Sequence, residues 1–210
     1  MRVGVIGAGR IGGNIARFLT RAGHEVLLSY AHDQDDLARR AAAIGCRAGS
    51  VAAAAGFGPV VVLSVPWTGI DAVLSEAGQL PGKIVVDTTN QFARGEPADL
   101  GGRTAAQVNQ ARMPGARLVK AFNTLTAGFQ AEAAGRTGPE RVVMFLCGDD
   151  PDAKTVVAGL IADSGFAPFD VGGLADAAVM EGPRRAGAVY GEEFHPADAE
   201  RFFGTGGAAR

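Results

Sequence analysis

Residues 1–30 read MRVGVIGAGRIGGNIARFLTRAGHEVLLSY, and this stretch decides the fold. Its apolar, β-branched start at 2–6 predicts a buried strand, and the helically spaced apolar residues of 14–22 predict a helix. A second buried strand is expected at 25–29. Between the first strand and the helix, GAGRIG at 7–12 matches the pattern G-x-G-x-x-G. A strand, a glycine turn, a helix and a strand in this order form the unit typical of dinucleotide-binding folds.

Each glycine of the turn has its own physical reason. Gly7 allows the tight turn out of the strand, Gly9 lets a pyrophosphate approach the backbone, and Gly12 lets the helix pack closely on the strand. The helix N-terminus then offers free N–H groups to the phosphates. The alternative is a glycine-rich turn without a ligand. The strand–turn–helix context favours a dinucleotide bound by Gly7, Gly9, Arg10, Ile11 and Gly12.

The rest of the chain alternates between apolar runs and helical patterns. Further strands are expected at 46–49, 59–65, 83–87, 117–122, 141–147 and 166–171, and further helices at 33–44, 68–77, 104–112 and from 150 onward. Polar, glycine-rich residues 91–103 are expected to form a loop. This alternation indicates an α/β fold with a doubly wound, mostly parallel, Rossmann-type sheet.

The expected domain organisation is an NAD(P)-binding domain over residues 1–172 and a short C-terminal extension over 173–210. Helical signals weaken in the extension, although 174–180 has a helical pattern. Phe202 and Phe203 are expected to dock on an apolar surface, and 204–210 are expected to be disordered.

Composition excludes several classes of function. The net charge of −2 over 210 residues gives no electrostatic footprint for nucleic acid or an anionic membrane. No stretch is long and apolar enough to span a membrane. Cys46 and Cys147 lie far apart and form no metal or redox motif, so we expect reduced thiols, no metal site and a cytoplasmic protein. The 17 arginines against 3 lysines are typical of high-GC bacterial genomes. A homodimer is left open.

Ligands of such sheets bind beyond the carboxyl ends of the strands. An NAD-preferring protein usually carries an acid after the second strand, whereas this chain has Ser29, Tyr30 and His32 and no acid before Asp33. Ser29 and His32 could donate hydrogen bonds to a 2′-phosphate, which favours NADP over NAD. The alternative is that Ser29 caps the next helix while Tyr30 stacks on adenine.

Polar and apolar residues follow the later strands at the same edge. Pro66 fixes the backbone where the chain leaves the sheet, and Trp67 either lines the cleft or belongs to the core. Asp87 is expected to cap or orient a loop rather than act as a base. The residues expected beside the cofactor are Ser64, Val65, Pro66, Trp67, Asn90 and Asn123.

The sequence contains no recognisable nucleophile–base pair and no zinc-type spacing, so the catalytic residues stay unassigned. His24 lies in a turn, where a surface position is expected. Reduction of a carbonyl or imine would need a proton donor, and the candidates are Lys120, Tyr190 and His195.

Four segments together resemble the NADP-dependent oxidoreductases that act on the deazaflavin coenzyme F-420. They are GAGRIG at 7–12, SVPW at 64–67, DTTN at 87–90 and VKAFNT at 119–124. The resemblance covers about residues 1–180. The cytosolic domain of six-transmembrane metalloreductases has a similar fold.

This resemblance implies NADP along residues 9–11 and Ser29, with the nicotinamide near Pro66 and Ala121. It also implies a deazaflavin that faces the nicotinamide, in a slot of backbone and apolar groups that includes Phe122. Tyr30 stands where family members that bind NADP tightly carry Arg.

Three functions are therefore weighed. The first is hydride transfer between NADP(H) and F-420 or another flavin, such as FMN or FAD, in which the protein supplies alignment. The second is NADPH-dependent reduction of a small carbonyl or imine. The third is a dinucleotide-binding sensor without catalysis.

Overall fold

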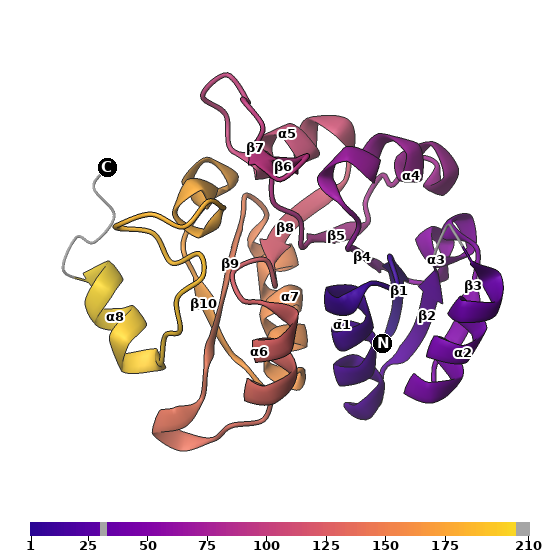
Figure 1. Cartoon of the computed structure of the whole chain (residues 1–210), viewed down its shortest axis with the longest axis horizontal. Helices are drawn as coiled ribbons and strands as arrows, with labels where there is room; N and C mark the ends of the chain where they lie inside the picture. Colours follow the sequence, from indigo (N-terminus) through magenta and orange to yellow (C-terminus); the bar gives the residue numbers. More distant parts are fainter. Residues whose placement is uncertain (30–32, 205–210) are drawn as a thin grey trace.

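A computed structural model describes residues 1–29 and 33–204 of the chain (Figure 1). In the described residues, eight strands form one sheet in the order β10-β9-β8-β5-β4-β1-β2-β3. The strands are β1 (Arg2–Ile6), β2 (Glu25–Ser29), β3 (Arg47–Gly49), β4 (Val60–Leu63), β5 (Ile84–Asp87), β8 (Arg117–Ala121), β9 (Val143–Gly148) and β10 (Ala167–Asp170). After β3 the chain crosses to β4 on the other side of β1. The strand order reverses there, and such a switch point is where doubly wound sheets bind ligands.

The sheet is mostly parallel, as predicted. The pair β8–β9 is antiparallel, with Val119 opposite Gly148, whereas β10 returns parallel to β9. The short helix α6 (Ala127–Ala133) lies in the connection between β8 and β9, and the sequence analysis did not predict it. The last two strands therefore extend a parallel, Rossmann-type sheet beyond β8.

Helices cover both faces of the sheet, because side chains of each strand alternate between two cores. The helices are α1 (Arg10–Arg21), α2 (Gln34–Ile44), α3 (Val51–Phe57), α4 (Ile70–Ala77), α5 (Ala105–Arg112), α7 (Pro151–Asp163) and α8 (Pro196–Gly204), with short 3-10 turns η1 (Trp67–Gly69), η2 (Gly138–Glu140) and η3 (Leu174–Met180). Val5 packs into the core beneath α1, α2, α6 and α7. Its neighbour Ile6 packs into the core beneath α3, α4, α5 and η3.

The start of α1 and the segment 91–103 differ most from the sequence prediction. Helix α1 begins at Arg10 rather than at residue 14, because Gly9 already takes the extended N-cap conformation with φ −67° and ψ −169°. Residues 91–103 contain a two-stranded antiparallel ribbon of β6 (Phe92–Ala93) and β7 (Glu96–Pro97). The sequence analysis predicted a loop here because the segment is polar and rich in glycine.

The C-terminal segment packs on the sheet through aromatic rings, as predicted for Phe202 and Phe203. The ring centroid of Phe203 lies 5.1 Å from that of Phe169 and 5.8 Å from that of Phe145. Helix α8, yellow in Figure 1, thereby lies beside β10. Gly204, which we expected to be disordered, is the last residue of α8, and 205–210 lie outside the described residues. The division at residue 172 stays a prediction.

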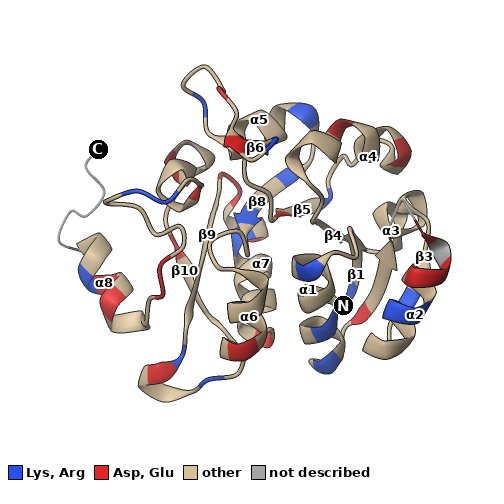
Figure 2. Cartoon of the chain, viewed as in Figure 1, with Lys and Arg blue, Asp and Glu red and all other residues tan. Residues whose placement is uncertain are grey.

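Charged side chains are spread over all parts of the fold (Figure 2). None of the helices in the described ranges is long and apolar enough to cross a membrane. Within the same residues, no group of three or more His, Cys, Asp or Glu side chains could hold a metal ion.

Candidate functional site

The glycine turn joins β1 to α1, and its three glycines differ in what surrounds them. A Cβ atom on Gly7, whose φ is +112°, would lie 2.0 Å from the carbonyl oxygen of Ser64. A Cβ atom on Gly12 would lie 2.0 Å from the carbonyl oxygen of Gly7. A Cβ atom on Gly9 would meet no described atom within 4 Å. Packing therefore requires the first and third glycines, whereas Gly9 leaves an open cradle at the N-terminus of α1.

Three cavities surround this turn. The cleft cavity, of about 460 Å³, is lined by Gly9, Arg10, Ile11, Ser64, Val65, Pro66, Trp67, Thr88, Thr89, Asn90 and Phe92. A second cavity, of about 370 Å³, lies on the other side of Gly9 and Arg10, along α1, α2 and α6. Because Arg10, Arg17 and Arg40 line it, we call it the arginine groove. A third, apolar pocket of about 350 Å³ lies between Gly7, Pro66 and α4. A ligand at the turn thus has space on every side.

The cleft cavity brings together half of the sixteen residues that the sequence analysis expected at the cofactor. It gathers residues 9–11 of the glycine turn, the segment 64–67 and Asn90 from three separate parts of the chain. Ala121 and Phe122 do not line it, because both are fully buried at the end of β8. Asn123 is also buried and contacts the cavity through Asn90.

Asn90 and Asn123 tie the cleft to the C-terminal segment. The Asn90 amide donates to the carbonyl oxygen of Asn123 at 3.0 Å, and the Asn123 amide donates to Asn90 Oδ1 at 3.1 Å. Asn123 also donates to the carbonyl oxygen of Met180 at 2.7 Å, and the Gly182 N–H donates to Asn90 Oδ1 at 3.1 Å. The two amides therefore hold residues 180–182 against the cleft.

Phe122 adopts a positive φ of 60°, which is a strained conformation for a bulky residue. Its carbonyl oxygen accepts a hydrogen bond of 3.0 Å from Nε2 of the buried Gln130. Strain of this kind persists only where the surroundings impose it, and it is concentrated at functional sites. The strained residue lies directly after β8, where the chain turns at the cleft.

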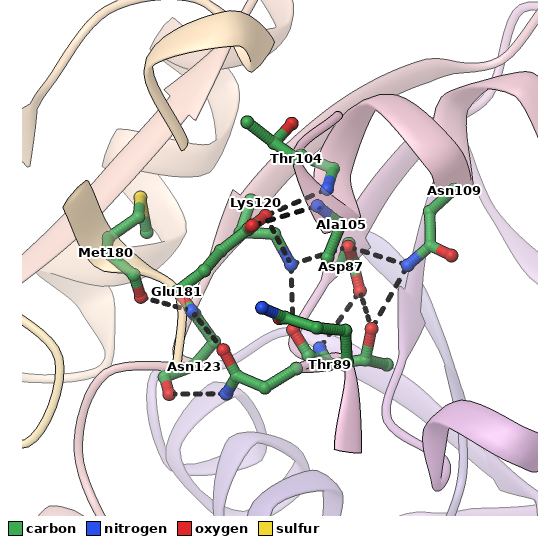
Figure 3. A network of polar contacts seen from close by, with 12 residues as sticks. Asp87, Thr89, Thr104, Ala105, Asn109, Lys120, Asn123, Met180 and Glu181 are labelled. Atoms are coloured by element: carbon green, nitrogen blue, oxygen red, sulfur yellow. Dashed lines mark hydrogen bonds and ion pairs between the residues drawn. The ribbon is translucent and has the colours of Figure 1, made fainter. Parts of the chain in front are cut away.

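A buried ionic network lies beside the cleft (Figure 3). Lys120 is fully buried, and its ammonium lies 2.9 Å from Asp87 Oδ2 and 3.7 Å from Glu181 Oε1. It also donates to the carbonyl oxygen of Thr89 at 2.7 Å. Lys120 is thus enclosed by acceptors and does not reach the cavity as a free proton donor.

The second carboxylate of the network caps a helix. Glu181 accepts the backbone N–H groups of Ala105 and Ala106, each at 2.8 Å, at the N-terminus of α5. Helix N-termini stabilise anions, so the helix offsets the negative charge that Lys120 alone would leave. Asn109 of the same helix donates to Asp87 Oδ2 at 3.0 Å. No local pattern in the sequence points to Glu181 or Asn109, because their partners lie far away along the chain.

Asp87 orients a loop, in agreement with the sequence prediction. Its Oδ1 accepts the N–H of Thr89 at 2.9 Å and the hydroxyl of Thr89 at 2.8 Å. These bonds shape the segment after β5 that lines the cleft cavity. Both oxygens of Asp87 are occupied inside the protein, as the structural role requires.

Ser29, the last residue of β2, differs from both sequence interpretations. Ser29 is fully buried, and its hydroxyl donates to the carbonyl oxygen of Val5 at 3.3 Å. Asp33, not Ser29, caps α2 by accepting the N–H of Asp36 at 3.0 Å, and this bond lowers the pKa of the Asp33 carboxyl. Tyr30 and His32 lie outside the described residues, so the expectations for them stay predictions.

Trp67 fulfils both roles that the sequence left open. Its side chain is 7% exposed and belongs to the core under α4, yet it lines the cleft cavity. The Arg112 guanidinium lies 4.5 Å from the ring centroid, a cation–π arrangement that fixes the indole. Phe92, in the segment predicted as loop, forms part of the same wall, and the polar sequence around it gave no signal.

The other titratable candidates lie away from the cavity. The Tyr190 ring is 6.4 Å from Phe92, behind the wall, and burial raises the pKa of its phenol. His195 Nδ1 lies 3.2 Å from the carbonyl oxygen of Arg141. Burial raises the pKa of the Cys147 thiol to about 12, although the Lys120 ammonium opposes that shift. His24, expected at the surface, pairs with Asp163 at 2.9 Å.

Comparison with known proteins identifies the family. The model of the family "NADP oxidoreductase coenzyme F420-dependent" matches residues 2–91. A crystal structure of a hypothetical protein from Sinorhizobium meliloti is 32% identical, with a TM-score of 0.83, over 93% of this chain and 96% of that chain. A candidate F420-dependent NADP reductase from an Arthrobacter species is 27% identical, with a TM-score of 0.72, over 84% of this chain and 87% of that chain. The chain belongs to this family.

Two further proteins match the chain over parts of their length. The metalloreductase STEAP3 of Rattus norvegicus is 34% identical over 123 residues, which are 58% of this chain and 24% of that relative. The chain thus spans about a quarter of the length of this curated relative. A reductive aminase from Aspergillus terreus, solved with NADPH, is 18% identical with a TM-score of 0.61 and shares the fold alone; the match covers 84% of this chain and 56% of that one.

The family match and the site overlap in part. Residues 2–91 contain the glycine turn, the segment 64–67 and Asn90, so the family model covers nearly the whole cleft cavity. Lys120 and Glu181 lie beyond the matched range. The family and its neighbours support NADP(H) as the dinucleotide, and they are NADP-dependent oxidoreductases.

Proposed function

We propose that this chain transfers a hydride between NADP(H) and the deazaflavin coenzyme F-420 or another flavin-type ring. The observation that carries the proposal is the open cradle at Gly9, which leads directly into the cleft cavity. Protein packing does not demand a glycine there, whereas a pyrophosphate at a helix N-terminus does. The match to a family of NADP oxidoreductases agrees with this assignment.

The cleft cavity favours a flat ring as the second reactant. Pro66, Trp67 and Phe92 give it apolar walls, and the hydroxyl and amide groups of 88–90 lie at its base. Among the described residues, no Asp, Glu, His, Cys or Lys side chain lines it. Its apolar walls suit the face of a flat ring, and no acid or base of the described lining lies beside that ring.

NADPH supplies the hydride chemistry when it is bound, and the protein contributes orientation and electrostatics. The N–H groups at the start of α1 bind phosphate oxygens, and the fixed backbone at Pro66 positions the ring that follows. The Asn90–Asn123 pair keeps the base of the cleft rigid by holding residues 180–182 in place. Full reduction of the acceptor ring also takes up a proton, which the solvent would supply, so no protein group has to change protonation state.

Reduction of a small carbonyl or imine is the second candidate, and Tyr190 is the observation that favours it. Burial raises the pKa of this phenol, and its ring centroid lies 6.4 Å from that of Phe92, which lines the cleft cavity. A movement of Phe92 would expose a proton donor of the kind that such a reaction requires.

One assay separates these functions. Purified protein is mixed with NADPH and, in parallel, with F-420, FMN, FAD, a panel of carbonyls and imines, or no acceptor, and NADPH oxidation is followed by absorbance. We expect rapid oxidation with F-420 or a flavin, and loss of that activity in Gly9→Val. Oxidation only with a carbonyl or imine would contradict flavin-type transfer. NADPH binding without turnover with any acceptor would contradict an enzyme and favour a binding module.

A further inference from the structure

In the structure, Ser29 is not placed to bind a 2′-phosphate. Its hydroxyl is fully buried and donates to the Val5 carbonyl oxygen within the sheet. The nearest charged groups on this side of the turn belong instead to α1 and α2. Figure 2 shows basic segments on both of these helices, which contact each other.

The arginine groove collects these charges. Its lining includes Arg10 and Arg17 of α1 and Arg40 of α2, together with Leu28 near the end of β2. The described lining contains no Asp or Glu. A dinucleotide whose pyrophosphate lies at the start of α1 places its adenosine ribose near the end of β2. The groove therefore opens where a 2′-phosphate would project.

Arg40 is the arginine that the structure holds closest to the glycine turn. Its Nη1 donates to the carbonyl oxygen of Ala8 at 3.3 Å, and its Nε lies 2.5 Å from Asp36 Oδ2. These two bonds orient the guanidinium over the turn. The Arg40 side chain is 49% exposed, and within the described residues its Nη2 makes no hydrogen bond or ion pair.

The groove lining holds three arginines and no carboxylate, whereas Asp33, Asp35 and Asp36 lie at the start of α2. Asp36 is shared between Arg40 and Arg39, whose Nη2 lies 3.5 Å from Asp36 Oδ1. One carboxylate therefore contacts two guanidiniums, so Asp36 is not paired with Arg40 alone. Guanidinium forks bind phosphate through paired, charge-assisted hydrogen bonds, and they bind a ribose hydroxyl far less strongly.

We propose that Arg40, on α2, recognises the 2′-phosphate of NADP(H) in the arginine groove and thereby selects NADP(H) over NAD(H). The inference rests on the proposed use of NADP(H), but it does not depend on which acceptor takes the hydride. It assigns to a helix side chain, which the turn itself holds in place, the role that the sequence analysis gave to Ser29.

The test compares two fragments that differ only in the phosphate. Calorimetry measures the binding of 2′,5′-ADP and of 5′-ADP to the full chain and to its variants, and the ratio of the two dissociation constants is the readout. We expect Arg40→Ala to reduce the preference for 2′,5′-ADP by about ten- to a hundredfold and to change 5′-ADP binding little. Arg40→Lys should retain part of the preference, because it keeps the charge without the fork.

Arg39→Ala is the matched control, because it removes the same charge from the neighbouring position of α2. Its side chain is 68% exposed, contacts the same Asp36 and does not line the groove. We expect less than about a threefold change in the ratio. Thermal unfolding verifies that each variant is folded.

Three outcomes would overturn the proposal. Equal weakening of both fragments by Arg40→Ala would mean that Arg40 only supports the turn through Ala8. An equal effect of Arg39→Ala would mean that the charge acts at long range. Loss of the preference in Arg17→Ala but not in Arg40→Ala would place the phosphate deeper in the groove. Failure of the flavin assay would leave the fragment ratio unaffected, so the two proposals fail separately.

Discussion

The glycine turn and the Lys120 network both lie beside the cleft cavity. The turn acts through its backbone, whereas the network consists of side chains. The turn consists of the six consecutive residues 7–12, and its function depends on glycines, which have no side chain. The network is made of buried charged side chains from Asp87 to Glu181, which the fold brings within 4 Å of one another. A motif of consecutive residues can be recognised in the sequence, whereas contacts between residues far apart along the chain cannot. The two should also fail differently when they are mutated.

The largest expected effect is loss of stability on breaking the network. Lys120→Met removes the ammonium between Asp87 and Glu181 and leaves two buried carboxylates without their cation. We expect the free energy of unfolding to fall by about 3–5 kcal/mol, as measured by urea denaturation. Lys154→Met is the control, because its pair with Asp170 is partly exposed and should contribute less than about 1 kcal/mol. Similar losses in both variants would show that the network is not a structural centre.

The contrast between these regions also explains what the sequence could predict. The apolar runs predicted the parallel strands, and the glycine motif predicted the turn beside the cleft cavity, because both patterns lie in neighbouring residues. Helix α6 was missed because its seven residues are too few for a clear periodicity. Asp87 was placed in its loop, but its partners Asn109 and Lys120 follow 22 and 33 positions later, and no pattern in one sequence links them. Ser29 lies at the position in sequence where a contact with the 2′-phosphate was expected, but its hydroxyl donates to the Val5 carbonyl oxygen inside the sheet.

The second effect is loss of binding without loss of stability. Gly9→Val places a side chain in the cradle that is open in the protein, so the fold should persist while the dissociation constant for NADPH rises by about a hundredfold or more. Fluorescence titration and thermal unfolding give the two quantities. Gly56→Val is the control, since Gly56 is exposed on α3 and its Cβ would also meet nothing within 4 Å.

Gly12→Ala sharpens the same comparison. Its Cβ would lie 2.0 Å from the carbonyl oxygen of Gly7, so this variant should lose stability as well as binding. Unchanged NADPH binding by a folded Gly9→Val protein would place the dinucleotide elsewhere.

A smaller effect is expected for the proton-donor candidates. Tyr190→Phe and His195→Ala should each lower turnover with a flavin-type acceptor by less than about tenfold, because hydride transfer between aligned rings needs no acid. The pH–rate profile should show no steep limb that either substitution removes. If the protein instead reduces a carbonyl or imine, loss of its donor should lower turnover by about 10²–10⁴-fold at unchanged NADPH affinity. Such a loss in Tyr190→Phe would overturn flavin-type transfer.

The smallest effect is expected at Ser29, the residue that sequence reasoning placed beside the 2′-phosphate. Its hydroxyl already donates to the Val5 carbonyl oxygen inside the sheet, so Ser29→Ala removes one internal hydrogen bond and no ligand contact. We expect a loss of about 1 kcal/mol in the free energy of unfolding and an unchanged ratio of NADPH to NADH dissociation constants. An aspartate at this position would be a poor test, because it would bury a carboxylate and unfold the end of β2 for reasons unrelated to the cofactor. If Ser29→Ala lowers the preference for NADPH as much as Arg40→Ala does, then the hydroxyl turns toward the ligand when the dinucleotide binds, and recognition is shared between the strand end and the helix.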